Sequence, residues 1–518
     1  VQDITPIGCN ISREGTKSVL NYRYLMPNTV GMCGGVLIGI KNGAPKILGI
    51  HIAGNGSVAV AARLFSCYDQ GKAEVKFRAP VPLYHLNTRS QLKRSPFSDG
   101  EEKLEPSPLS AKDPRLEVEV EDMVKRAAQK YVGNVYNVPP DIRREAKRRV
   151  AKRIFDVVCH VDVVSFEKAV DSEFLPIDWQ TSSGLKYKKP KSELISDPGF
   201  SKDVDDILRG EGDVYFVTHL KDELRPIEKV KVGKSRAIEA SNFDYVVATR
   251  MVLGEFYSKI YSDVECKSGL AVGINPYCDF MSLYANLKEN VLALDFSGFD
   301  GSLPPQLMED AMEVIKMCHK NPKLVELVCM PTIYSTQLVS NEVWTTEGGM
   351  CSGSPLTTVM NSICNLLVAE TVFLNFGVEG YTVAYGDDCL WSTDEVFDCV
   401  NLADLIYFNF GMKATSATKT PFICLQSKND VSFLKRKFKL YRGYLVGVLF
   451  FDEICEHIKW CKNLSTFEDQ VYSACLELVP YGRDVYEQVT NQWHQRCKAV
   501  KIVPFDLAVE QYDQMVFV

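Results

Sequence analysis

Apolar and polar residues alternate in short runs over roughly the first 65 residues. Val36–Ile40 and Lys46–Ile50 flank Asn42-Gly43, a dipeptide typical of hairpin turns, and Val58–Leu64 is a further strand-like run. This region is therefore predicted to be β-rich. Residues 71–118 are rich in Pro, Ser and charge and show little periodicity, so they are predicted to be mostly irregular.

Helical spacing dominates several later segments. The region Glu119–Cys159 is predicted to be helical, with Pro139-Pro140 opening its basic part, since proline is favoured at the start of a helix. Ser302 stands before a second Pro-Pro pair and is predicted to cap the helix that follows. The other predicted helices are Asn361–Phe376 ended by Gly377, a tail helix opened by the capping box Ser465–Glu468, and Asp484–Cys497.

Three acidic residues occur where a solvated charge is not expected. Asp295 ends Asn290–Leu294, which is typical of a buried strand, while Asp387 and Asp388 lie in a turn between two short apolar strands. A cluster of carboxylates is costly unless a cation neutralises it, and all-oxygen ligands suit Mg²⁺ or Mn²⁺. Taken alone, Gly-Asp-Asp is also an ordinary β-turn, so the triplet by itself does not decide between the two interpretations.

Composition narrows the class of protein. The 518 residues are 46% hydrophobic and 24% charged, which is typical of globular chains, and the net charge is −7. Seventeen cysteines scattered over a long chain indicate reduced thiols rather than a disulfide scaffold. No run approaches the roughly 20 apolar residues that span a bilayer. The chain begins with Val1, which suggests an internal product of a longer chain.

Basic residues are clustered despite the acidic balance. Arg143–Arg153 holds seven Lys or Arg, and Lys435–Arg442 is a second basic run. Such clusters are compatible with a nucleic-acid partner, but a solvated helix face is the more frequent explanation of any single run.

The order of the acidic and glycine-rich blocks carries a family resemblance. Asp295-x4-Asp300, Gly348–Asn361 and Tyr385-Gly-Asp-Asp388 occur in sequence with a helix between each pair. The chain resembles the RNA-dependent RNA polymerases of picornavirus-like positive-strand RNA viruses over about residues 71–518, and a dicistrovirus-like origin is a guess. Further matching segments are Lys103–Ser107, Asp113–Leu116, Lys130–Asn134, Thr181–Gly184, Lys221–Arg225, Gly233–Ser241 and Phe433–Arg436.

The resemblance implies an α+β fold in the form of a closed right hand. Fingers are expected mainly over 71–245, and the palm over 246–440 with an inserted fingers segment near 265–290. A helical thumb is expected over 441–518.

The resemblance also implies roles for the acidic residues. Asp295 and Asp387 are expected to be the principal ligands of two Mg²⁺ ions, with Mn²⁺ as a substitute. Asp388 stands beside them, and the backbone carbonyl of Phe296 completes a metal shell. Lys419 aligns with the general acid for pyrophosphate departure.

Nucleotide and RNA contacts are implied in the same way. Asp300 and Asn361, helped by Ser352 and Thr357, resemble the group that senses the ribose 2′-hydroxyl. The triphosphate would be held by four cations, Arg236, Lys221, Arg225 and Lys229. Template and primer RNA would meet Thr181, Ser182, Ser183, Gly184, Lys435 and Arg436.

The amino-terminal segment carries a second resemblance. Gly31-Met-Cys33-Gly-Gly35 and Gly49-Ile-His51 are similar to the end of a picornavirus-like, chymotrypsin-fold cysteine protease. Cys33 would be the nucleophile and His51 part of the specificity pocket. Because none of the residues before Cys33 is His, residues 1–70 are expected to be a protease remnant without its base. Gln70–Gly71 resembles the protease–polymerase cleavage junction.

The family implies template and primer RNA, NTPs, a protein primer (VPg) and other viral replication proteins as partners. It implies an indirect association with membrane and a place in the host cytoplasm at viral replication complexes. Two alternatives to the polymerase stay open at this stage. One is a protease–polymerase precursor with cysteine protease activity. The other is a reverse transcriptase, which Asn361 opposite Asp300 disfavours.

Overall fold

The fold is that of a computed structural model of the chain. It describes residues 84–131, 135–417, 420 and 422–517, and in the amino-terminal part residues 2–7, 11–13, 16–18, 21–25, 36–41, 44–54 and 58–63. Four residues to which the sequence assigned roles lie outside these ranges, namely Cys33, Gln70, Gly71 and Lys419.

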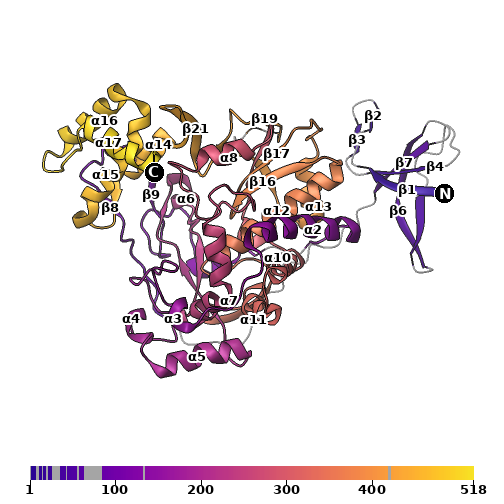
Figure 1. Ribbon diagram of the computed structural model, residues 1–518, viewed down its shortest axis with the longest axis horizontal. Coiled ribbons are helices and arrows are strands. Elements are labelled where there is room, and N and C mark those ends of the chain that lie inside the picture. The colour runs from indigo at the N-terminus through magenta and orange to yellow at the C-terminus, as the bar shows by residue number, and fades with distance from the viewer. Residues whose placement is uncertain are drawn as a thin grey trace.

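The amino-terminal residues form strands, as predicted. The strands are β1 Gln2–Ile7, β2 Ile11–Arg13, β3 Thr16–Ser18, β4 Asn21–Leu25, β5 Val36–Lys41, β6 Ala44–Gly54 and β7 Val58–Arg63. Five of them make an antiparallel sheet of order β1-β4-β7-β6-β5, and β2 pairs with β3 (Figure 1). The predicted hairpin is confirmed, because Val36 of β5 faces Ile50 of β6.

The centre of the predicted palm is an antiparallel sheet. Its strands are β13 Asn290–Phe296, β16 Gly380–Tyr385, β17 Asp388–Thr393, β18 Ala414–Ser416 and β19 Gln426–Ser427. The order is β16-β17-β13-β18, and β19 pairs with the beginning of β13. The buried strand and the hairpin predicted around the three carboxylates are therefore both confirmed.

Helices cover the palm sheet because side chains of a strand alternate between its two faces. The helices here are α8 Phe280–Asn286, α9 Phe299–Ser302, α10 Pro305–Met317, α12 Thr357–Phe376 and α13 Leu402–Phe410. Leu292 and Leu294 of β13 lie in one core with α10 and α12, whereas Val291 and Ala293 lie in a second core with α8. The alternating apolar residues thus fix β13 between two layers of helices.

The range predicted as fingers, 71–245, and parts of the range predicted as palm together combine short helices with a mixed sheet of order β12-β10-β14-β15. Strand β9 pairs with β11. The strands are β9 Leu104–Pro106, β10 Phe216–Leu220, β11 Leu224–Pro226, β12 Ala237–Ser241, β14 Tyr334–Val339 and β15 Glu342–Glu347. The helices are α1 Met123–Ala128, α2 Pro140–Val158, α3 Phe166–Ala169, α4 Lys191–Leu194, α5 Pro198–Arg209, α6 Ile227–Lys231, α7 Phe243–Tyr261 and α11 Pro322–Ile333.

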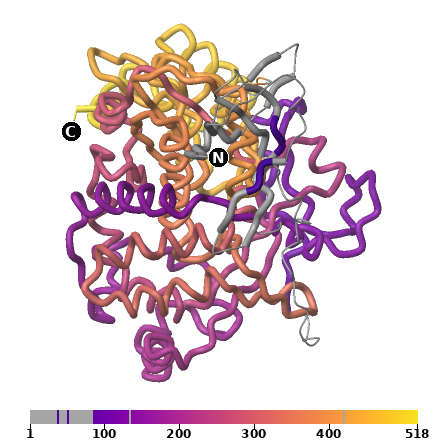
Figure 2. Tube along the Cα trace, turned by 90° about the vertical axis from the view of Figure 1, so that its right-hand side faces the viewer, coloured from indigo at the N-terminus to yellow at the C-terminus, as the bar shows by residue number. Residues whose placement is uncertain are grey.

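The predicted thumb has a hydrophobic core of its own. Its elements are β22 Tyr444–Leu449, α14 Phe451–His457, β23 Trp460–Cys461, η1 Leu464–Thr466, α15 Phe467–Leu478, η2 Val479–Tyr481, α16 Arg483–Arg496 and α17 Phe505–Val516. Two strands at the end of the predicted palm, β20 Ser432–Phe433 and β21 Arg436–Tyr441, pair with each other, and β21 pairs with β22. Figures 1 and 2 both place the thumb helices, coloured yellow, at the opposite end of the body from α5.

A segment from early in the chain closes the hand by joining the thumb. Strand β8, Lys93–Arg94, pairs with β23, and Phe97 is fully buried in the thumb core. The Phe97 ring lies 5.2 Å from that of Phe467 and stacks 5.5 Å from that of Trp493, measured between centroids. This large aromatic side chain therefore anchors the fingers segment to the thumb.

Two predicted helix starts are wrong. Ser302 does not cap α10: it ends the short helix α9, its hydroxyl donates to the carbonyl of Phe299, and the capping position is taken by Pro304. The capping box from Ser465 is also absent, because Asn463 caps the preceding 3₁₀ turn and α15 begins at Phe467. The region Glu119–Cys159 is helical in two parts, α1 Met123–Ala128 and α2 Pro140–Val158, and the predicted opening of the basic helix at Pro139-Pro140 is confirmed.

Helix α12 is the apolar centre of the body. By length and composition it could cross a membrane, with a mean hydropathy of 1.4, although its polar residues interrupt any continuous apolar run in the sequence. However, 83% of its apolar window is buried within the protein. Its apolar surface is thus used for packing, and Gly377 ends it in the left-handed conformation, as predicted.

Candidate active site

Two neighbouring strands bring the three carboxylates together. Asp295 lies near the end of β13, and the register pairs Leu294 of β13 with Cys389 of β17. Asp388 is the first residue of β17, directly after Asp387 in the turn that joins it to β16. Since β13 and β17 are adjacent, the predicted meeting of the carboxylates at one end of the sheet is confirmed.

The carboxylates repel one another. Although all three side chains are exposed to solvent, protein surrounds much of the Asp387 and Asp388 carboxylates. Loss of hydration, followed by the charges of Asp387 and Asp295, raises the pKa of Asp388 to about 6. Loss of hydration also raises the pKa of Asp387, with contributions from Asp300 and Asp295, while Arg236 acts in the opposite direction. The negative charge at the site therefore outweighs the positive charge that neighbouring side chains supply.

A divalent cation would supply the missing charge. Within the described residues, no three Asp, Glu, His or Cys side chains already stand together as a complete metal-binding group. The donor chemistry nonetheless fits a hard cation, because the three carboxylates offer only oxygen ligands, and the charge of Asp295 helps to raise the pKa of both Asp387 and Asp388.

Helix α12 fixes the turn that carries Asp387. The Gly386 backbone N–H donates to the hydroxyl of Ser362 at 2.8 Å, and the amide of Asn365 donates to the Gly386 carbonyl at 3.3 Å. The indole N–H of buried Trp391 donates to the Asn365 side-chain oxygen at 3.0 Å. No local sequence pattern points to these residues, because they act through contacts between separate elements.

The predicted ribose-sensing residues do come together. The Asn361 amide donates to Asp300 Oδ1 at 2.7 Å, and the Ser352 hydroxyl donates to Asp300 Oδ2. The side-chain oxygen of Asn361 is buried and has no partner among the described residues. A buried acceptor without a donor is costly, so this oxygen is available for a ligand hydroxyl.

Thr357 is placed differently from Ser352. Its hydroxyl lies against the carbonyls of Cys351 and Ser354, at 3.0 and 2.9 Å, and thereby closes the loop before α12. Thr357 therefore supports the loop that carries Ser352. A direct contact between Thr357 and a nucleotide stays a prediction.

The predicted triphosphate cations surround a carboxylate that the sequence did not single out. Arg236 donates two hydrogen bonds to Glu223, and Lys221 and Arg225 lie 3.6 and 3.8 Å from the same group. Burial opposes ionisation of Glu223, but the three cations outweigh it and lower its pKa. Asp387 and Asp300 help to raise the pKa of Arg236, which places this cation near the carboxylates. Lys229 is exposed on α6.

The predicted RNA-binding loop is partly structural. Thr181 and Ser182 are exposed, whereas Ser183 is buried and donates to the Lys189 carbonyl at 2.7 Å. Gly184 has φ +100°, and a Cβ there would lie 2.4 Å from the side-chain oxygen of Asn242. Only the first two residues of this loop are therefore free to contact RNA without rearrangement.

Lys435 and Arg436 lie in contrasting environments. Lys435 is in the two-residue turn between β20 and β21, where Leu434 and Lys435 both have positive φ, and its side chain is 61% exposed. It lies near enough to Asp388 for its charge to oppose the burial and the neighbouring carboxylates that raise the pKa of Asp388. The Arg436 side chain is only 14% exposed and forms a two-pronged ion pair with Glu477 of α15. The structure thus gives Arg436 a palm–thumb contact instead of the predicted RNA contact.

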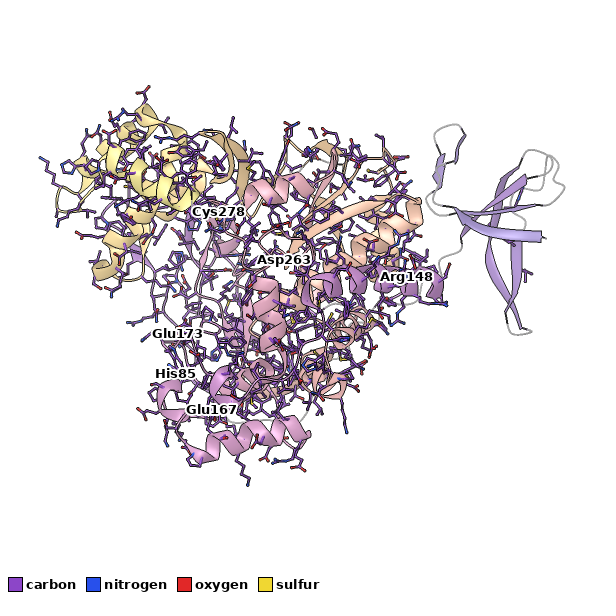
Figure 3. All side chains as sticks on the ribbon, in the orientation of Figure 1. His85, Arg148, Glu167, Glu173, Asp263 and Cys278 are labelled. Carbon is purple, nitrogen blue, oxygen red and sulfur yellow. The ribbon has the colours of Figure 1, made fainter. Side chains whose placement is uncertain are left out.

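The basic run on α2 is largely used for packing. Arg143 and Lys147 donate to the buried carboxylate of Asp310 on α10, at 2.7 to 3.0 Å. Arg149 pairs with Glu145 and Glu379. Arg148 lies at the surface, as Figure 3 shows, and pairs with Glu145 of its own helix. A structural explanation therefore accounts for most of this run.

In the amino-terminal sheet, His51 is buried on β6. Cys33, the nucleophile expected from the protease resemblance, lies outside the described residues, as does the junction Gln70–Gly71.

One end of the palm sheet thus carries three neighbouring carboxylates, with the Asn361–Asp300 pair and the Arg236 cation close by. Residues 96–498 match the family model described as viral RNA-dependent RNA polymerase, and the chain belongs to this family. Membership makes it an RNA-directed RNA polymerase by class, and such polymerases bind template RNA and NTPs and use divalent metal ions. Residues 1–56 match the model described as 3C cysteine protease (picornain 3C).

Relatives and solved structures agree with this assignment. The genome polyprotein of Ljunganvirus 1 is 38% identical over 95% of this chain and 23% of its own length. That of Human parechovirus 5 (strain CT86-6760) is 36% identical over 100% of this chain and 25% of its own length. The chain thus spans about a quarter of these relatives.

The fold is similar to that of the Sicinivirus 3Dpol RNA dependent RNA polymerase. The TM-score is 0.75 with 22% sequence identity, covering 86% of this chain and 99% of the other. This likeness confirms the predicted closed right hand. The division into fingers, palm and thumb at particular residues stays a prediction, and so does the dicistrovirus-like origin.

Proposed function

We propose that this chain copies an RNA template by joining ribonucleotides to the 3′-hydroxyl of a primer. The observation that carries the proposal is the buried side-chain oxygen of Asn361, which has no partner among the described residues and stands on Asp300 beside the carboxylates. A site built to bind a hydroxyl rejects an analogue that lacks it, because its buried polar atom is then left unpaired.

Asp295 and Asp387 would hold two divalent ions, with Asp388 and the carbonyl of Phe296 completing the shells. We propose Mg²⁺ as the usual ion and Mn²⁺ as a substitute, since both accept oxygen ligands. When bound, such ions lower the pKa of an attacking hydroxyl and neutralise charge on a leaving group. The chain's own contribution is a rigid turn, held on α12 by Ser362 and Asn365.

The triphosphate would be bound by exchange of ion-pair partners. Arg236 is held by Glu223, and an incoming triphosphate offers the same two-pronged acceptor geometry as a carboxylate. Further positive charge around the triphosphate would come from Lys221, Arg225 and Lys229. The triphosphate would thus replace the Glu223 carboxylate as the ion-pair partner of Arg236. Lys419 is proposed to give a proton to the departing pyrophosphate, on the family resemblance alone.

The partners follow from this activity. We propose that template and primer RNA pass over Lys435, Thr181 and Ser182, which are exposed. A protein primer (VPg) and other viral replication proteins are proposed partners on the family resemblance, with an indirect association with membrane. The proposed location is the host cytoplasm, at viral replication complexes.

The test is primer extension on a homopolymeric RNA template with Mg²⁺. Wild type should extend the primer with NTPs, and Asp387→Ala should not. Asp394→Ala is the matched control, because Asp394 follows directly after the same strand β17 and its exposed carboxylate pairs with Lys288 and accepts the Glu289 backbone N–H at the surface. Loss of extension in the control as well, or its retention in Asp387→Ala, would remove the metal role from Asp387.

The alternatives receive less support. The match of residues 1–56 to a cysteine protease favours a protease segment in this chain, but the chain supplies no His before Cys33 to act as base. A peptide spanning a Gln–Gly bond should therefore stay uncut by this chain, and cleavage would favour the precursor. Incorporation of dNTPs as readily as NTPs would favour a reverse transcriptase.

A further inference from the structure

A lysine from the early fingers reaches into the ribose-sensing group. The Lys130 ammonium lies in the turn after α1 and donates to the Ser352 hydroxyl oxygen at 2.9 Å. It also donates to Glu239 Oε2 at 2.7 Å. Glu239 is on β12, and its side chain has 0% exposure while that of Lys130 has 20%. The sequence placed Lys130 in a family-like segment without a role.

The backbone at Lys130 and the ring of Tyr131 pack closely against the two segments that carry Asp300 and Ser352. A Cβ on Gly301 of α9 would lie 2.3 Å from the Lys130 carbonyl oxygen. A Cβ on Gly349, before the Ser352 loop, would lie 2.3 Å from the Tyr131 ring. The glycines allow these close approaches, so the position of Lys130 is fixed relative to both Asp300 and Ser352.

Glu239 ties the loop to the fingers from the other side. Its Oε2 also accepts the backbone N–H of Ser352 at 3.0 Å, and Gly353 forms a bridge with Ala240 of β12. A buried carboxylate is stable only when it is paired, and Lys130 is the cation that pairs with it. Lys130, Glu239 and Ser352 therefore form a closed triangle next to Asp300.

This triangle determines which acceptor receives the hydroxyl proton of Ser352. An ammonium group can only donate, so the Ser352 oxygen must act as acceptor toward Lys130. The single hydroxyl proton of Ser352 is then left for Asp300 Oδ2, as the structure shows. Without the ammonium, the same hydroxyl could turn its proton toward Glu239, and Asp300 would lose a donor.

We propose that Lys130 is a positioning residue for sugar selection, acting through Ser352 and Asp300 on the ribose 2′-hydroxyl. The inference rests on the proposed function, because it names what tunes selectivity at that same site. The ligand chemistry is a ribose hydroxyl of an incoming NTP, and Lys130 itself does not touch the reacting atoms.

The test compares incorporation of ATP and dATP opposite one template uridine on primed RNA. Lys130→Met keeps the length of the side chain and removes the charge. It should lower the ratio of kcat/KM for ATP to that for dATP by about ten- to a hundredfold, the worth of one charge-assisted hydrogen bond. The value for dATP should change little, because dATP lacks the 2′-hydroxyl.

Two further variants separate positioning from stability. The double variant Lys130→Met/Glu239→Gln removes both buried charges, so it should regain thermal stability while its selectivity stays low. Lys125→Met is the matched control: Lys125 on α1 forms an ion pair with Glu342 at 2.6 Å, away from the triangle, and should keep wild-type selectivity.

Three results would overturn the inference. They are an equal loss of ATP and dATP incorporation in the Lys130 variants, wild-type selectivity in the double variant, or the same change in the Lys125 control. A wild-type chain that extends no primer would instead refute the proposed function, and the inference would fall with it.

Discussion

Substitutions of the neighbouring residues Lys435 and Arg436 should have different effects: loss of Arg436 should lower stability, whereas loss of Lys435 should weaken RNA binding. Arg436 donates to both oxygens of Glu477, at 2.9 and 2.5 Å, and to the Gly447 carbonyl at 2.8 Å. Tyr277 also donates to Glu477 at 2.7 Å. With the Glu477 side chain only 11% exposed, removing the guanidinium would leave a carboxylate that is nearly buried and poorly compensated.

Arg436→Met should therefore lower the free energy of unfolding by about 3–5 kcal/mol, the usual cost of breaking a buried ion pair from one side. The double variant Arg436→Met/Glu477→Gln should recover much of this loss, because it leaves no unpaired charge. Thermal or urea unfolding of the four chains measures the effect as a double-mutant cycle.

Lys435→Ala should leave unfolding almost unchanged, since its ion pair with Glu453 is exposed. It should instead reduce the dependence of RNA binding on salt. Each phosphate contact contributes a slope of about 0.7 in log K against log salt for single strands. A titration at several salt concentrations measures it. Should Arg436→Met lower this slope while its unfolding stays at the wild-type value, the assignment of Arg436 to the palm–thumb contact is wrong.

Three other perturbations test separate parts of the site. In EDTA, Asp387→Ala should melt at or above the wild-type temperature, because it relieves repulsion, and a clearly lower melting point would contradict a strained acidic cluster. Burial raises the pKa of Glu370 above 4.5, so wild type should lose stability as pH rises through that raised pKa. In urea unfolding, Glu370→Gln should lose less stability than wild type as the pH rises above 4.5, and equal losses would exclude this titration. Trp391→Phe removes the donor to Asn365 and should slow primer extension while the fold is retained; unchanged extension would show that the turn needs no such support.

Local patterns predicted the chemical centre well. An apolar run ending in Asp295 and a hairpin around Asp387 suffice to predict neighbouring strands, because burial and turn chemistry act within a few residues. The same local rules failed at Ser302 and Ser465. There the chain continues into a short turn of helix, and Pro304 or Asn463 takes the capping position.

Contacts between distant residues could not be predicted in this way. Lys130 meets Glu239 and Ser352 across separations of 109 and 222 residues, and no spacing rule connects them. Likewise, the sequence places Arg436 in a basic run but does not show that Glu477 lies opposite it. Burial and pairing of charges depend on the assembled fold, so these roles emerge only from the structure.

The most direct test of the whole account is a single-nucleotide competition between ATP and dATP on a primed RNA template with Mg²⁺. Wild type should strongly prefer ATP, and Asn361→Ala should narrow that preference by about ten- to a hundredfold, since the variant loses both the amide bond to Asp300 and the buried acceptor. Equal use of the two nucleotides by wild type, or an unchanged preference in Asn361→Ala, would contradict the claim that this site selects ribonucleotides for RNA synthesis.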